Sequence, residues 1–73
     1  MGIKIIVKVV FYSTKDVWES FGNNRYMLKL SYPEDEDALG LITAHISRQM
    51  GVPSSKVSFR GKDPAKNWVF EVM

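Results

Sequence analysis

The sequence predicts a single α+β domain in which one helix packs on one face of a four-stranded mixed sheet. Apolar and polar residues alternate in several short segments, and one longer segment repeats its apolar residues at helical spacing. Glycine, asparagine and proline separate these segments, as they do in turns. A chain of 73 residues is near the lower size limit for one hydrophobic core, so we expect one domain over residues 1–73.

Two strands are expected in the first half of the chain. Residues 3–11 are rich in β-branched side chains, and residues 25–31 alternate in the same way before Pro33. Residues 16–21 are consistent with either a short strand or an irregular arm. The segment Gly22-Asn23-Asn24 predicts a turn, because both residue types tolerate a positive φ.

The helix is expected over about Asp35–Met50. Its apolar stripe recurs every three or four residues, at Leu39, Ile42, Ile46 and Met50. Four acids, residues 34–37, lie where the helix dipole is positive, with Asp35 as the expected N-cap. Gly51 fits a left-handed C-terminal cap.

Two further strands are expected at residues 56–60 and 68–72. The order β-β-α-β-β places the two most apolar strands, the first and the last, side by side in the centre of the sheet. We expect each outer strand to form a hairpin with its central neighbour and the helix to cross over between the hairpins. The resulting order is 2-1-4-3, which resembles a minimal β-grasp.

The residue types needed for catalysis are scarce in this sequence. The chain has no cysteine and a single histidine, His45, in the middle of the expected helix. Ser47 lies two residues away, which places it on a different side of a helix. Zinc ligand spacings, a phosphate-binding glycine loop and a calcium loop are all missing from the sequence. We therefore expect no enzyme, no metal and no cofactor.

The sequence favours a cytoplasmic protein without a membrane segment. Small secreted domains usually depend on disulfides, and this chain has no cysteine. No stretch reaches the ~18 apolar residues that a membrane span needs. Lys4 and Lys8 interrupt the first apolar run, which therefore does not resemble a secretory signal.

Basic side chains are expected on the sheet face that the helix does not cover. Strand alternation should place them together between apolar neighbours. The residues concerned are Lys4, Lys8, Arg25, Lys29 and Arg60. Such a face is consistent with an ordinary solvated surface, with a nucleic-acid backbone or with a protein partner. Trp18 lies outside the clear strand patterns and is the candidate aromatic for a contact surface.

The leading hypothesis is a non-catalytic protein-interaction module whose sheet edge, at residues 25–31 or 56–60, accepts a strand. The alternative is a nucleic-acid-binding domain that uses the basic outer face of the sheet. The acidic run could also meet the basic face of a second copy. We therefore expect a monomer or a weak homodimer.

Several short stretches resemble the YggU-like family of small uncharacterised α+β proteins. The alternating start at residues 3–9, the Leu28–Pro33 stretch and Gly51-Val52-Pro53-Ser54-Ser55-Lys56-Val57 after the helix carry this resemblance, with Gly61 and Lys66 before the last strand. The family implies an α+β fold and no established activity. Residues 51–62 also resemble the helix-to-strand passage of ubiquitin, which implies a β-grasp topology.

Overall fold

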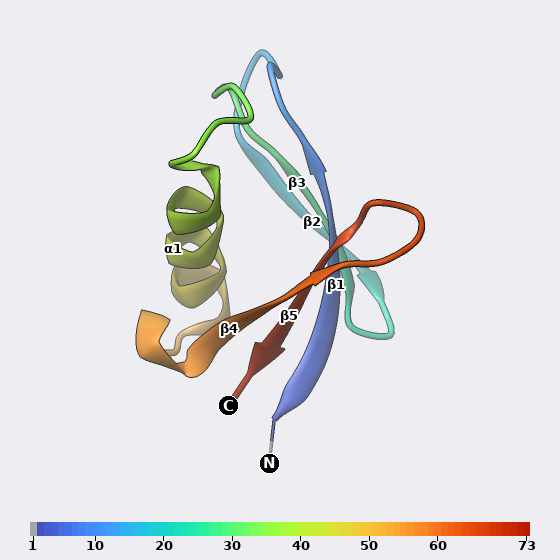
Figure 1. Cartoon of the computed structure of the whole chain (residues 1–73), viewed down its shortest axis with the longest axis vertical. Coiled ribbons are helices and arrows are strands. Elements are labelled where there is room, and N and C mark those ends of the chain that lie inside the picture. The colour runs from blue at the N-terminus through green and yellow to red at the C-terminus, as the bar shows by residue number, and fades with distance from the viewer. Residues whose placement is uncertain (1) are drawn as a thin grey trace.

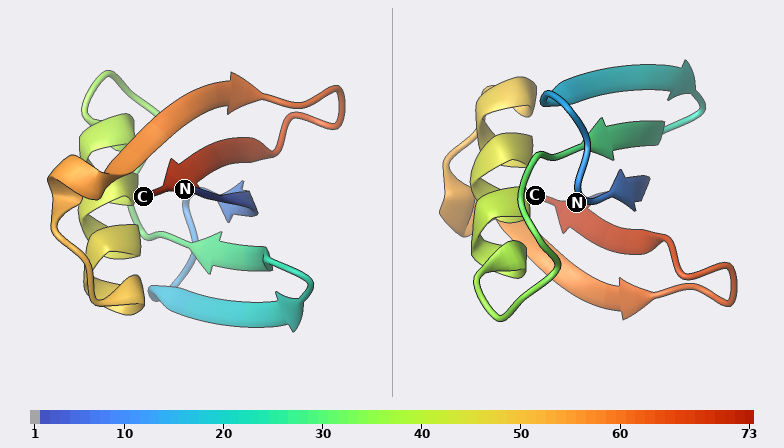
Figure 2. Two further views of the ribbon diagram at one scale, coloured as in Figure 1. Left: turned by 90° about the horizontal axis from the view of Figure 1, so that it is seen from below. Right: turned by 90° about the horizontal axis from the view of Figure 1, so that it is seen from above.

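The computed structural model describes residues 2–73 and has two layers, a sheet and one helix (Figure 1). Its elements are β1 (Ile3–Val10), β2 (Val17–Gly22), β3 (Arg25–Lys29), α1 (Ala38–Met50), a 3-10 helix (Ser54–Lys56), β4 (Val57–Lys62) and β5 (Trp68–Val72). The helix lies along one face of the sheet, and no other element of residues 2–73 covers the opposite face (Figure 2). We call the face towards α1 the inner face and the other the outer face.

The sheet has five strands in the order β2-β3-β1-β5-β4, which confirms the mixed α+β architecture but not the strand number. The four strands expected from the sequence are neighbours in the expected order, with β1 and β5 side by side in the centre. The additional strand is β2. It takes up the segment for which the sequence left a strand and an arm open, and it forms one edge of the sheet.

The expected hairpin between the first strand and residues 25–31 is wrong, because β1 and β3 are parallel. The chain leaves β1, returns along the sheet edge as β2, and turns back through Asn23 and Asn24 to enter between them as β3. Both asparagines have a positive φ, at 52° and 60°. Asparagine tolerates this conformation, which a tight hairpin turn requires. Residues 25–31 are therefore interior, and the edges of the sheet are β2 and β4.

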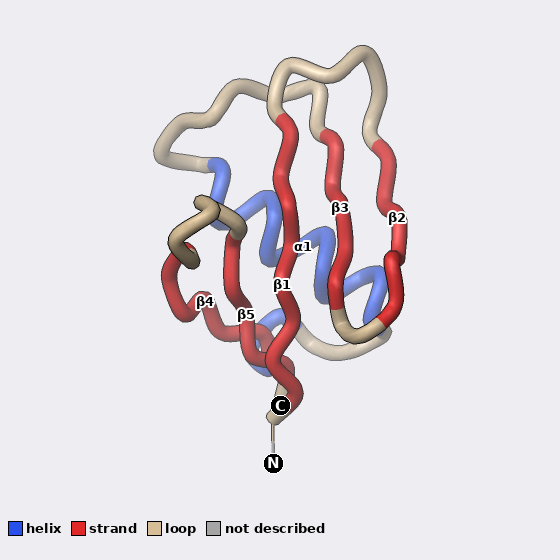
Figure 3. The backbone as a smooth tube through the Cα atoms, turned by 90° about the vertical axis from the view of Figure 1, so that its right-hand side faces the viewer, coloured by secondary structure: helices blue, strands red, loops and turns tan. Residues whose placement is uncertain are grey.

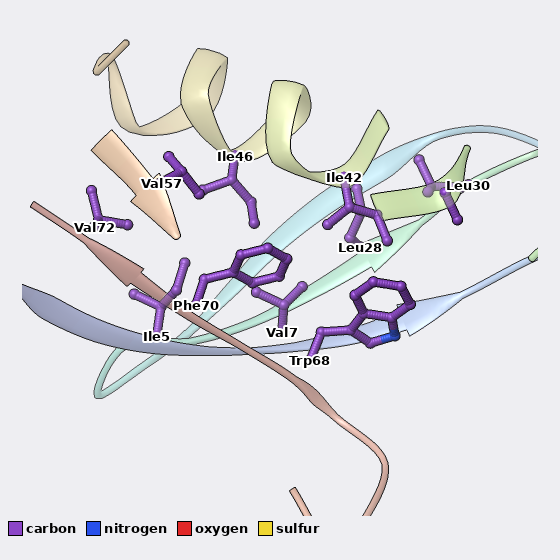
Figure 4. Packing of buried hydrophobic residues seen from close by; sticks show 11 residues of the cluster. Ile5, Val7, Leu28, Leu30, Ile42, Ile46, Val57, Trp68, Phe70 and Val72 are labelled. Atoms are coloured by element: carbon purple, nitrogen blue, oxygen red, sulfur yellow. The ribbon is translucent and has the colours of Figure 1, made fainter. Parts of the chain in front are cut away.

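The core lies between the inner face and α1 (Figure 4). Phe70 from β5 lies at its centre and is fully buried, as are Ile5 and Val7 of β1. In the register of β1 and β5, Phe70 lies opposite Ile5, and Trp68 lies opposite Val7. Ile42 and Ile46 point down from the helix onto these side chains. Burial of each such side chain contributes about 1.5–3 kcal/mol, so this contact layer fixes which face of the sheet stays open.

The helix begins three residues later than expected, at Ala38, so the acidic run precedes it. Asp35 does not cap α1; its carboxylate accepts a hydrogen bond from the backbone N–H of Asp37 at 2.9 Å, within the turn that leads into the helix. The buried stripe is Ala38, Ile42 and Ile46, whereas Leu39, expected in the stripe, is 38 % exposed. The buried residues are spaced by four, so the inward face of the helix is a narrow stripe with Leu39 at its side. The left-handed Gly51 cap is confirmed, with a φ of 69°.

Candidate functional site

Four of the five basic residues predicted for the outer face lie close together on the two neighbouring strands β1 and β3. We call Lys4, Lys8, Arg25 and Lys29 the cation patch. In the parallel register, Arg25 lies opposite Ile6, and Lys29 lies opposite Val10. Lys8 lies opposite Met27, between the two basic residues of β3. Figure 3 shows this face of the sheet towards the viewer, with α1 behind it.

The cation patch is not neutralised by ion pairs. Within residues 2–73, none of its four members forms a salt bridge, and the salt bridges present there are Arg60–Glu71 and Lys62–Glu34. Arg60 lies on the same face but its guanidinium is held by Glu71. The structure therefore brings four of the predicted residues together as free cations and shows the fifth to be paired.

Apolar side chains lie between the four cations. Ile6, Val10 and Met27 share the outer face with them by strand alternation, and all three are only half-buried. Val69, opposite Ile6 on β5, is almost fully buried by its neighbours on the same face. The surface thus combines apolar side chains with positively charged ones, as do surfaces that bind an extended polyanion.

A shallow hollow lies at the end of this face where β3 begins. Its volume is about 150 Å³, and it is lined by Ile6, Lys8, Phe21, Arg25, Tyr26 and Asn67. The hollow therefore joins two members of the cation patch to an exposed aromatic side chain and an amide. Phe21 is 57 % exposed.

A bulge in β2 presents Phe21. Ser20 pairs with Tyr26 and Gly22 with Arg25, so one residue of β2, Phe21, has no register partner on β3. Gly22 has a φ of 80°, a conformation that glycine adopts without strain. Bulges of this kind change the direction of the side chain at the irregularity. The hairpin thus holds an aromatic ring at the rim of the hollow.

The loop between β4 and β5 is fastened by Asp63. Its carboxylate accepts hydrogen bonds from the backbone N–H of Asn67, at 2.8 Å, and from Asn67 Nδ2, at 3.2 Å. The backbone hydrogen bond from Asn67 is the main cause that lowers the pKa of Asp63, and the charge of Arg25 also lowers it. Asp63 therefore stays ionised at neutral pH, fixes Asn67 at the hollow, and lies close enough to Arg25 to offset part of its charge.

Trp18 is not part of this surface. Its ring is half-buried on the inner face, stacked on Tyr26 with ring centroids 4.7 Å apart, and it also contacts His45 at 5.6 Å. The structure therefore separates Trp18 from the basic residues with which it was predicted as a contact residue. Its ring attaches the edge strand β2 to the core.

His45 lies beside this aromatic pair on α1. Its Nε2 is buried and has no hydrogen-bond partner within residues 2–73. Burial is the main cause that lowers the pKa of His45, the charge of Arg48 adds to the effect, and Asp16 opposes it. The hydroxyl of Ser47 donates to the backbone carbonyl of Val52 and is not available to the imidazole.

The acidic run lies on the helix side of the sheet, away from the cation patch (Figure 1). Glu34 forms a salt bridge with Lys62 at 3.1 Å. The ammonium of Lys62 also lies 4.7 Å from the centre of the Trp68 ring. The acidic run and the cation patch therefore lie on opposite sides of the domain.

No protein-family model, no curated protein and no solved structure matches this chain. The resemblances to the YggU-like family and to the β-grasp stay predictions. Within residues 2–73, no group of histidine, cysteine and acidic side chains is arranged to hold a metal ion. The helix of that part of the chain lacks the length and apolar character needed to cross a membrane.

Sequence reasoning found the cation patch but missed Phe21 and Asn67. Strand alternation was sufficient for the lysines of β1, because β1 is regular. Phe21 lies at a bulge, where alternation fails, and Asn67 reaches the hollow through a loop. The Gly22-Asn23-Asn24 turn was the available signal that residues 16–21 form a hairpin with β3.

Proposed function

We propose that this domain is a non-catalytic binding module that binds nucleic acid through the outer face of its sheet. The observation that carries the proposal is the cation patch: four basic side chains without salt bridges in residues 2–73, on adjacent strands of an uncovered face. Lysine and arginine neutralise phosphates and release their counterions, which favours binding at low salt.

The distribution of charge also favours the outer face as the binding surface. The acidic run lies on the helix side, where it would repel phosphates, and Glu34 is bound to Lys62. A polyanion is therefore attracted to one face and repelled from the other. The half-buried apolar residues between the cations offer contact surface to sugars and bases.

The experiment is fluorescence anisotropy with a labelled single-stranded RNA at several salt concentrations. For a single strand, each neutralised phosphate contributes about −0.7 to the slope of the logarithm of the binding constant against the logarithm of the salt concentration. Four contacts therefore give a slope of about −3. Lys8→Gln combined with Lys29→Gln should lower the affinity and bring the slope to about half of that value.

The matched control is Lys15→Gln combined with Lys56→Gln. Both lysines are exposed, and neither belongs to the cation patch, so the change in net charge is the same. The control variant should retain the slope and most of the affinity. Equal losses in the two double variants, or binding that does not depend on salt, would contradict the proposal.

A protein partner that adds a strand to β2 is the second candidate. The specific observation is that β2 forms a free edge of the sheet and carries the exposed Phe21. Strand addition should protect backbone amides of residues 17–20 from hydrogen exchange when a captured partner is bound. Captured partners that leave these amides unprotected would argue against this binding mode.

A further inference from the structure

We infer that the hollow beside Phe21 is a base-stacking subsite, which makes the domain selective for single-stranded over double-stranded nucleic acid. This inference rests on the proposed nucleic-acid function and adds to it the form of the ligand. The cation patch alone does not distinguish strands from duplexes, because both present phosphates.

The exposed ring is the first support for this inference. Phe21 is 57 % exposed although an aromatic side chain of this size is usually buried, and the bulge in β2 holds it there. Aromatic rings displayed on a positively charged surface are the platforms on which unpaired bases stack. A base within a duplex is already stacked on its neighbours and has no free face to offer.

The second support is the chemistry around the ring. Lys8 and Arg25 line the same hollow, so phosphates on either side of a stacked base meet positive charge. Asn67 also lines it and carries both a hydrogen-bond donor and an acceptor. Its Nδ2 is bound to Asp63, which fixes the orientation of the amide. An amide held in this way can meet the edge of a base.

The third support is the size of the hollow. At about 150 Å³ it is well below the volume of an ordinary enclosed small-molecule pocket, which is about 300 Å³ or more. An open hollow of this size suits one flat ring that lies partly on the surface, with the rest of its chain running along the sheet. The occupant that fits is therefore one base of a longer polyanion.

The test compares three probes of one length, roughly 12 nucleotides, which is within the range bound by single-strand-binding domains. They are a single-stranded RNA, the same strand annealed into a duplex, and a strand with the same backbone but without bases. The proteins are the wild type, Phe21→Ala and Phe21→Leu. Tyr12→Ala is the matched control, because Tyr12 is a 78 % exposed aromatic residue that does not line the hollow.

The wild type is expected to bind the single strand most tightly. Phe21→Ala should lose at least about 5-fold in affinity for the single strand, the lower end for the loss of one stacked base, and should bind the duplex and the baseless strand as the wild type does. Phe21→Leu should behave like Phe21→Ala, because leucine is apolar but has no ring. Tyr12→Ala should leave all three affinities unchanged.

Two outcomes would overturn the inference in distinguishable ways. If Phe21→Ala or Phe21→Leu binds the single strand as tightly as the wild type, while Lys8→Gln with Lys29→Gln weakens binding, the proposed function stands and the stacking subsite is wrong. If the wild type binds none of the three probes at low salt, the proposed function fails and the subsite fails with it. Melting temperatures of the variants show whether each protein is folded, and Phe21 is exposed enough that both substitutions should leave the fold intact.

Discussion

Arg60 on β4 and Glu71 on β5 form an ion pair across the outer face of the sheet. The guanidinium of Arg60 donates through Nε to Oε1 of Glu71 at 3.1 Å, and its Nη2 donates to the same oxygen. In the register of β1 and β5, Glu71 lies opposite Lys4. The carboxylate that faces Lys4 is therefore engaged by a neighbouring arginine, and the two charges cancel at one side of the proposed nucleic-acid surface.

Glu71→Gln should extend the positive surface. The substitution removes the carboxylate and frees Arg60, so affinity for single-stranded RNA should rise several-fold at low salt and the salt slope should steepen by about 0.7. An exposed ion pair contributes only about 0–1 kcal/mol, so the free energy of unfolding should change little. Glu19→Gln is the control, because it removes another acid of this face without freeing an arginine from a salt bridge. Equal effects in the two variants would show that Arg60 does not reach the ligand.

Trp18→Ala should destabilise the domain far more than Phe21→Ala, although both aromatic residues lie on β2. Trp18 stacks on Tyr26 and contacts His45, whereas Phe21 is mostly exposed. Loss of a packed tryptophan costs about 3 kcal/mol, and loss of an exposed phenylalanine less than about 1 kcal/mol. Chemical denaturation measures the two free energies, and hydrogen exchange should show faster opening of β2 in Trp18→Ala. Similar stabilities would contradict the inward placement of Trp18.

The domain should lose stability as the pH falls below neutral, and His45 should be the cause. Burial lowers the pKa of His45 from the ordinary value of 6.5, so the unfolded state binds more protons in this range. Stability is therefore fully present above about pH 6.5 and decreases as the pH falls towards the lower folded pKa. The measurement is the melting temperature between about pH 7.5 and pH 5.5 in wild type and His45→Gln. As the chain has a single histidine, a slope retained in His45→Gln would point to another group.

Within the acidic run, Asp35 should matter more for stability than Glu36. The Asp35 carboxylate accepts the backbone N–H of Asp37 at 2.9 Å, so Asp35→Ala should cost about 1 kcal/mol, as the loss of a cap-like hydrogen bond does. Glu36 forms no hydrogen bond or ion pair within residues 2–73, and Glu36→Gln should stay within about 0.5 kcal/mol. The melting temperatures should not depend on protein concentration. If neutralising the run instead leaves stability unchanged and abolishes self-association, its main role is contact with a second copy.

Much of the architecture could be predicted from the pattern of apolar residues and from the residues that favour turns. The apolar character of β1 and β5 was sufficient to place them in the centre, and the spacing of Ile42 and Ile46 identified the inward face of α1. The direction of β3 could not be predicted, because it depends on whether residues 17–22 pair with it. Those residues mix Trp18 on the inner face with exposed Glu19 and Ser20, so their alternation is weak.

The candidate site was predictable to the same extent. Regular strands made Lys4 and Lys8 predictable, since alternation alone decides their face. The pairing of Arg60 with Glu71 required the register of β4 against β5, which no local pattern contains. The position of Phe21 depends on a single extra residue in β2. Local sequence therefore indicates which face is charged, and long-range pairing decides which charges are free.

The central position of β1 also constrains the order in which the sheet assembles. β1 pairs with β5 from Ile3 opposite Val72 onwards, so the two middle strands come from widely separated parts of the chain. Closing such a long loop costs entropy before any contact compensates for it, and proteins dominated by distant pairings fold slowly. Until β5 docks, the apolar edge of β1 lacks a partner and is open to pairing with other chains. The hairpin of β2 and β3, which is local, can form early and cover only the other side of β1.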